Sequence, residues 1–186
     1  MQKELDRLVD ALNKGQIILY PTDTVWGLGC DATNKDAVDK IYEIKHRPSS
    51  KSLIIMVSNF LMLQQYIDSV PFKAVELMEE ATGPLTVIYP NARNIAGNLI
   101  GEDGSVGIRI PNDEFCKRLI SAFGKPIVST SANISGEKPS SIFKNISSDI
   151  INAVDYVTKY RQDDDTIAEP SSIIKVNIDG SILKIR

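Results

Sequence analysis

The chain has 186 residues, of which 42% are hydrophobic and 24% charged, with 21 Lys and Arg against 24 Asp and Glu. The net charge of −3 argues against a protein that binds nucleic acid through its overall charge, although a local basic face is compatible with it. Cys30 and Cys116 fit no metal or redox spacing, which indicates reduced thiols in a cytosolic protein.

The start of the chain is polar and no apolar run approaches the ~20 residues of a membrane span, so we expect neither a signal peptide nor membrane contact. Hydrophobic periodicity then predicts alternating helices and strands in the first half. In order, these are a helix over 3–14, a strand over 16–20, a polar loop over 21–33, a helix over 34–47 capped by Asn34, a strand over 52–57, helices near 59–67 and 71–81 with Pro71 in the first turn of the second, and a strand over 84–90.

The second half opens with an aperiodic stretch over 91–105, which we predict to be a long loop. The elements after it are a strand over 106–111, a helix over 113–124, a strand over 125–133 that runs into a polar loop, a helix near 147–153, a strand over 155–159, and a hairpin over 171–186 around Asp179-Gly180. This order predicts one domain over residues 1–186, of the α/β class with a mixed, twisted sheet.

Several familiar motifs fail on inspection. Gly27 to Ala32 fits G-x-G-x-x-A, but it begins seven residues beyond Tyr20, too far for a dinucleotide-binding turn. His46 is the only histidine, so sites that need two histidines are excluded, and we interpret it as a helix-end residue. Asp163 to Asp165 is compatible with a bound cation, but a solvated loop is the favoured interpretation.

Three polar clusters are compatible with chemistry. Lys45 and Arg47 stand at a helix end before a proline, where they act either as anion ligands or as exposed cations that suit the helix C-terminus. "STSAN", residues 129–133, leaves a buried strand and is either a ligand loop or a polar turn. Arg109 should face the opposite side of its strand from its isoleucine neighbours, where it either pairs with a carboxylate or phosphate or extends to solvent. Together these clusters predict an anion site that works by alignment and electrostatic stabilisation.

Six ordered motifs carry a family resemblance that covers nearly the whole chain. They are "YPTDTVWGLGCDAT", "KHRPSSKSL", "GPLT", "VGIRIP", "STSANISG" and "PSSIIKV". The chain resembles the YrdC-like threonylcarbamoyl-AMP synthases, in their short form. The resemblance implies a YrdC-like twisted mixed sheet flanked by helices, with a concave, positively lined ligand cavity.

The resemblance also implies a reaction. Members of the family join L-threonine, bicarbonate and ATP into threonylcarbamoyl-AMP and pyrophosphate, with Mg²⁺ expected on the phosphates. A partner transferase then acts on tRNA, and direct contact with tRNA or double-stranded RNA is compatible with the family. The open alternatives are an RNA-binding or translation-associated YrdC-like protein without synthase activity and a carbamoyltransferase-type accessory domain.

Site residues follow from the motifs by resemblance. The family's K-x-R and S-x-N pairs are present here as the catalytic and ATP-binding residues Lys45, Arg47, Ser131 and Asn133. Further ATP-binding positions match Ser140 and Arg186, and the threonine-binding positions match Thr22, Arg109, Ser129 and Ser171. No resident metal ligand is implied.

Two further expectations come from the resemblance. The loop over 21–33 should form one wall of the cavity, with the ring of Trp26, where the family usually has tyrosine, beside the ligand. The segment from Asn98 to Ser105 matches a loop that the family holds over the cavity.

Overall fold

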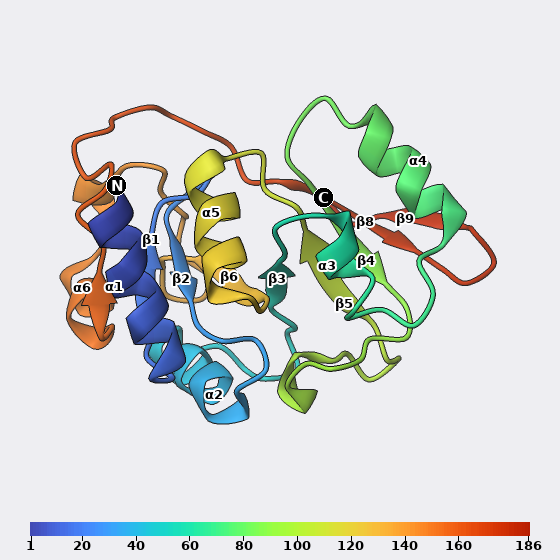
Figure 1. The fold of residues 1–186 in the computed structure, drawn as a ribbon, viewed down its shortest axis with the longest axis horizontal. Coiled ribbons are helices and arrows are strands. Elements are labelled where there is room, and N and C mark those ends of the chain that lie inside the picture. Colours follow the sequence, from blue (N-terminus) through green and yellow to red (C-terminus); the bar gives the residue numbers. More distant parts are fainter.

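A computed structural model describes all residues from Met1 to Arg186 as helices packed around one twisted nine-stranded sheet (Figure 1). The helices are α1 (Gln2–Asn13), α2 (Lys35–Ile44), α3 (Phe60–Leu63), α4 (Phe72–Glu80), α5 (Glu114–Phe123) and α6 (Ser148–Ala153), with the 3₁₀ turns η1 (Gly97–Leu99) and η2 (Phe143–Asn145). The strands are β1 (Ile18–Tyr20), β2 (Gly27–Gly29), β3 (Ile54–Met56), β4 (Leu85–Tyr89), β5 (Val106–Arg109), β6 (Ile127–Ser131), β7 (Tyr156–Val157), β8 (Ser172–Val176) and β9 (Ile182–Lys184). The prediction of an α/β fold with a mixed, twisted sheet is confirmed.

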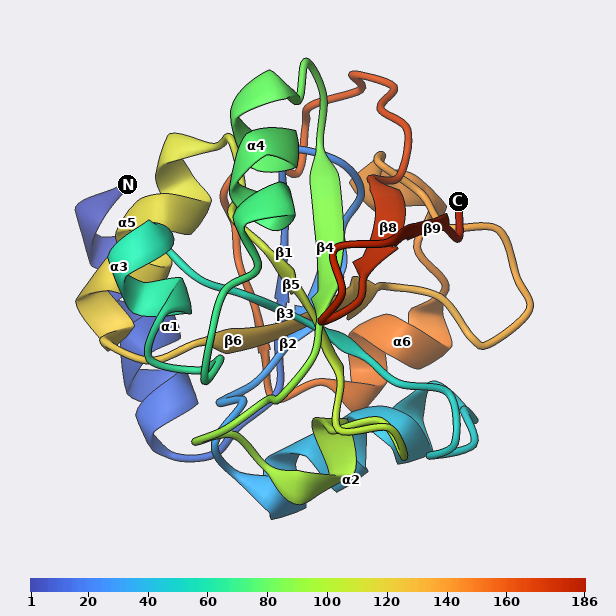
Figure 2. The ribbon, with the colours of Figure 1, turned by 90° about the vertical axis from the view of Figure 1, so that its right-hand side faces the viewer.

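The strand order is β7-β1-β2-β6-β3-β5-β4-β8-β9, and the β8–β9 hairpin closes one end of the sheet beyond β4 (Figure 2). The pairs β1–β7, β3–β5 and β4–β8 are parallel, and the others are antiparallel. β6 joins the two halves because it pairs with β2 through Thr130 and Ser131 and with β3 through residues 127–129. The polar "STSAN" segment therefore begins in the centre of the sheet.

Helix boundaries follow from local sequence signals. The side chain of Asn34 accepts the N–H of Ala37 at 3.2 Å and starts α2, as predicted. Asp113 starts α5 by accepting the N–H of Cys116 at 2.8 Å. α5 ends at Gly124, which adopts the left-handed conformation with φ of 76° that glycine tolerates without strain.

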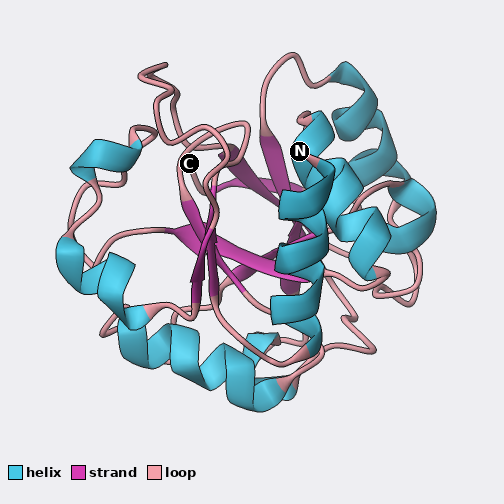
Figure 3. Ribbon diagram, turned by 60° about the vertical axis from the view of Figure 1, so that its left-hand side comes forward, coloured by secondary structure: helices cyan, strands magenta, loops and turns pink.

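The core has two parts, one on each face of the sheet. Along β1 and the residue before it, Ile17 and Leu19 belong to a cluster of 28 buried residues, whereas Ile18 and Tyr20 belong to a cluster of 13. α1 and α5 lie side by side over the smaller cluster, and helices cover both faces of the strands (Figures 1 and 3). None of the helices combines the length and apolarity needed to cross a membrane.

The structure corrects four details of the sequence prediction. Part of the expected loop over 21–33 is a strand, β2, because two glycines let it run between β1 and β6. The helix expected near 59–67 is the single turn α3, and Pro71 precedes α4 as its N-cap. The stretch 91–105 contains η1, which packs against α2.

Gly29 tests how tightly β2 fits between its neighbours. A Cβ at this position would lie 2.8 Å from Cε1 of Tyr20 and 3.0 Å from Cγ2 of Ile127. We expect Gly29→Ala to lower the free energy of unfolding by about 1–3 kcal/mol, the usual cost of overpacking. Urea denaturation measures the change, and Gly97→Ala, where a Cβ meets nothing within 4 Å, is the control. Equal stability of the two variants would contradict this packing.

Candidate functional site

A cavity of about 200 Å³ opens beside the centre of the sheet and draws its walls from segments between residues 22 and 186. It is lined by three arginines and seven hydroxyl side chains, and by no acidic residue: Arg47, Arg109, Arg186, Thr22, Thr24, Ser52, Ser129, Thr130, Ser131 and Ser171. Such a lining is positive although the whole chain carries −3. The cavity is therefore suited to anions.

Lys45 joins the end of α2 to the end of β6. Its side chain is buried, with 1% of the residue exposed, and its Nζ donates to the carbonyl oxygens of Ser131 and, at 2.7 Å, of Asn133. The Lys45 carbonyl accepts the N–H of Ser135 at 2.9 Å. The interpretation of Lys45 as an exposed helix-end cation is therefore wrong. Its side chain lies outside the cavity lining, and its contact with ATP stays a prediction.

Burial has an electrostatic consequence for this lysine. Burial, together with the nearby charge of Arg47, lowers the pKa of the Lys45 ammonium to about 8. The hydrogen bonds from the ammonium to the two carbonyl oxygens offset part of the free-energy cost of desolvation, because hydrogen bonds from a charged donor are strong.

Arg47 reaches the cavity because the chain reverses directly after α2. His46, which is exposed, adopts φ of 48°, in the left-handed region that few residues other than glycine occupy. Arg47 donates from Nε to the Lys51 carbonyl at 2.9 Å and from Nη2 to the Ser52 carbonyl at 3.0 Å. The guanidinium is therefore held at the cavity wall with its charge unpaired by any carboxylate.

The turn after β6 provides the other half of this corner. Ser129 and Ser131 line the cavity, but Asn133 lies outside its lining. The Asn133 amide donates to the carbonyls of Ile134 at 2.8 Å and Glu137 at 2.9 Å, while its buried Oδ1 has no partner. An unpaired buried acceptor is unfavourable, and the predicted contact of Asn133 with ATP stays a prediction.

Ser140 does not line the cavity, and its contact with ATP stays a prediction. Its hydroxyl donates to the carbonyl of Ile142 at 3.0 Å and accepts the N–H of the same residue. Its own carbonyl accepts the N–H of Trp26 at 3.0 Å, and the neighbouring Pro139 is the residue that reaches the lining. Ser140 therefore supports the cavity wall through its backbone without lining the cavity itself.

The loop before β2 forms a wall of the cavity, as predicted, through Thr22 and Thr24. Thr22 Oγ1 donates to the Val25 carbonyl at 2.8 Å, accepts the N–H of Thr24 at 3.1 Å and lies 2.9 Å from Thr24 Oγ1. Since its single proton is used, Thr24 must donate in the hydroxyl pair. The Thr22 hydroxyl is then fully engaged in the loop, and Thr24 retains free lone pairs.

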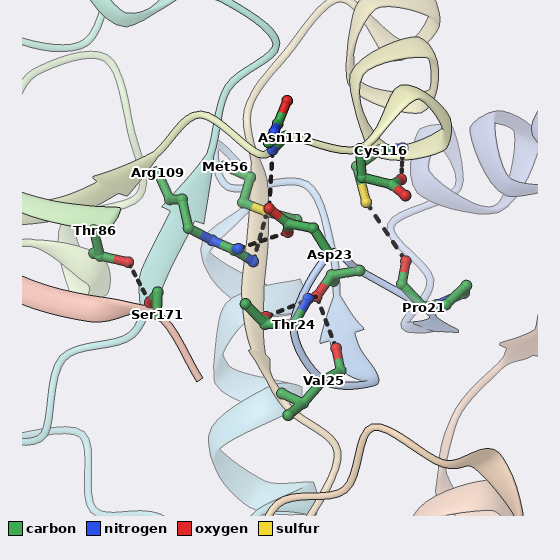
Figure 4. A network of polar contacts seen from close by, with 12 residues as sticks. Pro21, Asp23, Thr24, Val25, Met56, Thr86, Arg109, Asn112, Cys116 and Ser171 are labelled. Atoms are coloured by element: carbon green, nitrogen blue, oxygen red, sulfur yellow. Dashed lines mark hydrogen bonds and ion pairs between the residues drawn. The ribbon is translucent and has the colours of Figure 1, made fainter. Parts of the chain in front are cut away.

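Arg109 lines the cavity with 3% of the residue exposed, and its side chain points toward Asp23 (Figure 4). Its Nη1 donates to Asp23 Oδ1 at 2.6 Å, and Nη2 contacts the sulfur of Met56 at 3.4 Å. Its buried Nε has no partner. The predicted orientation is confirmed, because Ile108 and Ile110 line a different cavity, of about 550 Å³.

The remaining wall comes from β8 and the end of the chain. The hydroxyl of Ser171 pairs with that of the fully buried Thr86 at 2.8 Å (Figure 4). Arg186 donates from Nε and Nη2 to the Ser171 carbonyl, at 3.0 and 2.9 Å. These contacts fix Ser171 and leave the outer side of the Arg186 guanidinium at the cavity.

The cavity brings together most of the residues that the motifs pointed to, and their roles in binding stay predictions. Seven of the ten predicted residues line the cavity: Arg47, Ser131, Arg186, Thr22, Arg109, Ser129 and Ser171. Sequence reasoning missed Thr24, Asp23 and Thr86, although the first two stand next to Thr22 in the same polar triplet. Thr86 was hidden because a threonine in a buried strand gives no sequence signal of its own.

Two expectations about the surroundings were wrong. The Trp26 ring does not line the cavity: the residue is 2% exposed, and its ring lies 4.9 Å from that of Phe143 in the core. The segment 98–105 does not cover the cavity either, since the Asn98 amide donates to Asp39 of α2 at 2.7 Å.

The structure contains no group of three or more His, Cys, Asp or Glu side chains that could hold a metal ion. In the acidic run Asp163 to Asp165, Asp164 pairs with Arg161 at 3.0 Å and Asp165 with Lys144 at 3.4 Å. Two of these three carboxylates are therefore engaged with cations on the surface.

Comparison with known proteins identifies the family. The profile of the Sua5/YciO/YrdC family, described as "Telomere recombination", matches residues 10–186. A threonylcarbamoyl-AMP synthase of Pseudoalteromonas translucida is 38% identical over 139 residues, which cover 73% of this chain and 74% of that protein. One from Blochmanniella floridana is 40% identical over 135 residues, 71% of each chain. The chain belongs to the Sua5/YciO/YrdC family, as its motifs predicted.

Solved structures agree with this assignment. E. coli YciO matches the whole chain with a TM-score of 0.85 at 25% identity, and the match covers 89% of YciO. P. abyssi Sua5 in complex with L-threonine matches 92% of the chain with a TM-score of 0.81 at 28% identity. This chain spans about half the length of that Sua5 chain, with 50% covered.

The Lys45 contacts predict a stability difference within the K-x-R pair. Lys45→Ala leaves two carbonyl oxygens without their donor, so we expect it to cost about 1–3 kcal/mol of unfolding free energy. Arg47→Ala removes a partly exposed side chain, and we expect a cost under about 1 kcal/mol. Thermal and urea denaturation of both variants measure this, and equal costs would contradict the role of Lys45 as a cross-link.

The lowered pKa of Lys45 predicts a pH-dependent affinity. Below about pH 8 the ammonium is charged and favours anions, and above it the charge is lost. We expect ATP binding to weaken several-fold between pH 7.5 and 9, up to about tenfold for the loss of one such interaction. Calorimetric titration measures this, with Lys45→Met, which has no titrating amine, as the control. If Lys45→Met showed the same pH dependence of ATP affinity as the wild type, the dependence would come from another group.

Proposed function

We propose that this chain is a nucleotidyltransferase that makes threonylcarbamoyl-AMP and pyrophosphate from L-threonine, bicarbonate and ATP. The observation that carries the proposal is the cavity, which is lined by three arginines and by no acidic residue. The chain's relatives in the same family are named threonylcarbamoyl-AMP synthases. The L-threonine complex of P. abyssi Sua5 supports threonine as the amino acid. We propose further that residues 1–186 act as one unit.

We assign the nucleotide to the corner between α2 and β6. Arg47 and Arg186 both reach the lining with guanidinium groups that bind only backbone carbonyls, so both can receive phosphate oxygens. The hydroxyl of Ser131 lies in the same lining. Lys45 lies behind this corner, donates to the carbonyl of Ser131 and adds its charge. Asn133, whose Oδ1 has no partner, is kept as a further proposed contact of the nucleotide.

We assign L-threonine to the region around Arg109. The unpartnered Nε of this arginine supports a contact with the substrate carboxylate. Ser129 and Ser171 supply hydroxyls to the same lining. In the opening loop, the contact to the ligand passes to Thr24, because the hydroxyl of Thr22 is used within the loop.

The proposed reaction has two steps. The threonine amine attacks CO2 or bicarbonate and gives N-carboxythreonine, with loss of a proton and, from bicarbonate, of hydroxide. The new carboxylate then attacks the α-phosphorus of ATP, the bond to the β-phosphate oxygen breaks, and pyrophosphate leaves. The chain contributes by aligning the reactants and by stabilising the charge on the phosphates through Arg47 and Arg186.

The proposal includes Mg²⁺ and later partners of the product. Because the chain offers no metal-ligand cluster, we expect Mg²⁺ to arrive with the ATP phosphates, which supply the ligands it prefers. The product would be consumed by a threonylcarbamoyl transferase that acts on tRNA, which the family resemblance implies. The unpaired thiols of Cys30 and Cys116 support a location in the cytoplasm.

The decisive experiment measures threonine-dependent pyrophosphate release with ATP, bicarbonate and Mg²⁺, together with the adenylate itself. We expect the wild type to be active and Arg47→Ala to lose about 10²–10³ in rate, the usual cost of one group that stabilises developing charge. Lys35→Ala, which removes an exposed lysine at the start of α2, is the control and should keep full activity.

One result would contradict the proposed function, and another would contradict only the role of Arg47. A wild type that releases no threonine-dependent pyrophosphate would favour the alternative of a YrdC-like RNA-binding protein without synthase activity. An active wild type with an equally active Arg47→Ala variant would leave the function standing and remove Arg47 from the phosphate site.

A further inference from the structure

We propose that Asp23 is a positioning residue: it orients and neutralises Arg109, so that this arginine accepts the carboxylate of an amino acid and rejects the phosphates of the nucleotide. The identity of the two ligands rests on the proposed function. The proposal itself rests on a contrast among the three arginines that line the cavity, Arg47, Arg109 and Arg186.

The contact between Asp23 and Arg109 leaves one edge of the guanidinium free. Asp23 Oδ1 accepts from Nη1 at 2.6 Å, and Nη2 has only the weak sulfur acceptor of Met56 at 3.4 Å (Figure 4). Nε is buried and has no partner. Since Nε and Nη2 form the edge away from Nη1, that edge has no oxygen acceptor, and a second carboxylate is the group that would satisfy it with two parallel hydrogen bonds.

Asp23 is itself held firmly and lies behind Arg109. Its Oδ2 accepts the backbone N–H of Asn112 at 2.9 Å, and its side chain is 10% exposed. Asp23 does not line the cavity of about 200 Å³ that Arg109 lines, but the second cavity, of about 550 Å³. It therefore acts on a ligand through Arg109 and not by contact.

The other two arginines are partnered differently. Arg47 binds the carbonyls of Lys51 and Ser52, and Arg186 binds that of Ser171. Carbonyl partners orient a guanidinium without cancelling its charge, whereas the carboxylate of Asp23 does cancel the charge of Arg109.

This difference divides the cavity electrostatically. A highly charged triphosphate gains most from the uncompensated charges of Arg47 and Arg186. A free amino acid carries one carboxylate and one ammonium, and it gains more from the directed hydrogen bonds of a neutral Asp23–Arg109 pair. Asp23 thereby assigns each substrate to its own end of one cavity.

Calorimetric titration with L-threonine, without ATP, tests the proposal apart from turnover. We expect Asp23→Asn to weaken threonine binding at least about tenfold and Asp23→Glu to restore part of it. Asp31→Asn is the matched control, because Asp31 is also a buried carboxylate in an ion pair, with Lys125 at 2.8 Å, and lies outside the cavity lining. Its threonine affinity should stay within about twofold of the wild type.

Inorganic phosphate provides the readout that a purely structural role would not change. We expect phosphate to compete with threonine in Asp23→Asn, where Arg109 carries an uncancelled charge, and not in the wild type. In turnover, the KM for threonine should rise while the KM for ATP stays within about twofold. Unchanged threonine affinity in a folded Asp23→Asn variant would overturn the proposal.

The wild-type arm keeps the proposal testable if Asp23→Asn does not fold. Phosphate that displaces threonine from the wild-type protein would also overturn it, since the pair would then not exclude phosphate. Failure of the synthase function is a separate result, because it appears as missing pyrophosphate release in a protein whose threonine binding still depends on Asp23.

Discussion

The buried ammonium of Lys45 is the contact on which the geometry of the cavity depends. It connects the end of α2 with two carbonyls of the turn after β6, across 86 residues of sequence to Ser131. Burying an ammonium is unfavourable, and the pKa of about 8 reflects that cost, which the two charge-assisted hydrogen bonds offset in part. The cross-link fixes Arg47, two residues further on, and the β6 hydroxyls beside the same cavity.

Around this cross-link, charge is distributed unevenly over a mildly acidic chain. All three arginines line the cavity, and Asp23, the carboxylate that pairs with Arg109, does not line it. A cavity of this kind concentrates positive potential in a small volume. It suits a reaction in which the reactants supply the nucleophile and the leaving group, and the protein supplies alignment and charge stabilisation.

The fold was largely predictable because its signals are local. Caps such as Asn34 and Asp113 and the periodic burial of α1, α2 and α5 mark the helices before any tertiary contact is known. β2 was not predictable, because a strand of three residues with two glycines has no strand propensity. It forms only because β1 and β6 both offer it hydrogen-bonding partners.

The sequence by itself determined the α/β class, the family and the residue types of the site, since these depend on periodicity and on ordered motifs. Only the tertiary structure decided which side chains face a ligand. Lys45 and Arg47 are two residues apart, yet one is buried beneath the cavity and the other lines it, because the left-handed turn at His46 separates their directions. Trp26 likewise entered the core against Phe143, and Asp23 became the partner of Arg109, 86 residues away, because contacts that are distant in the chain and invisible in the local sequence set their surroundings.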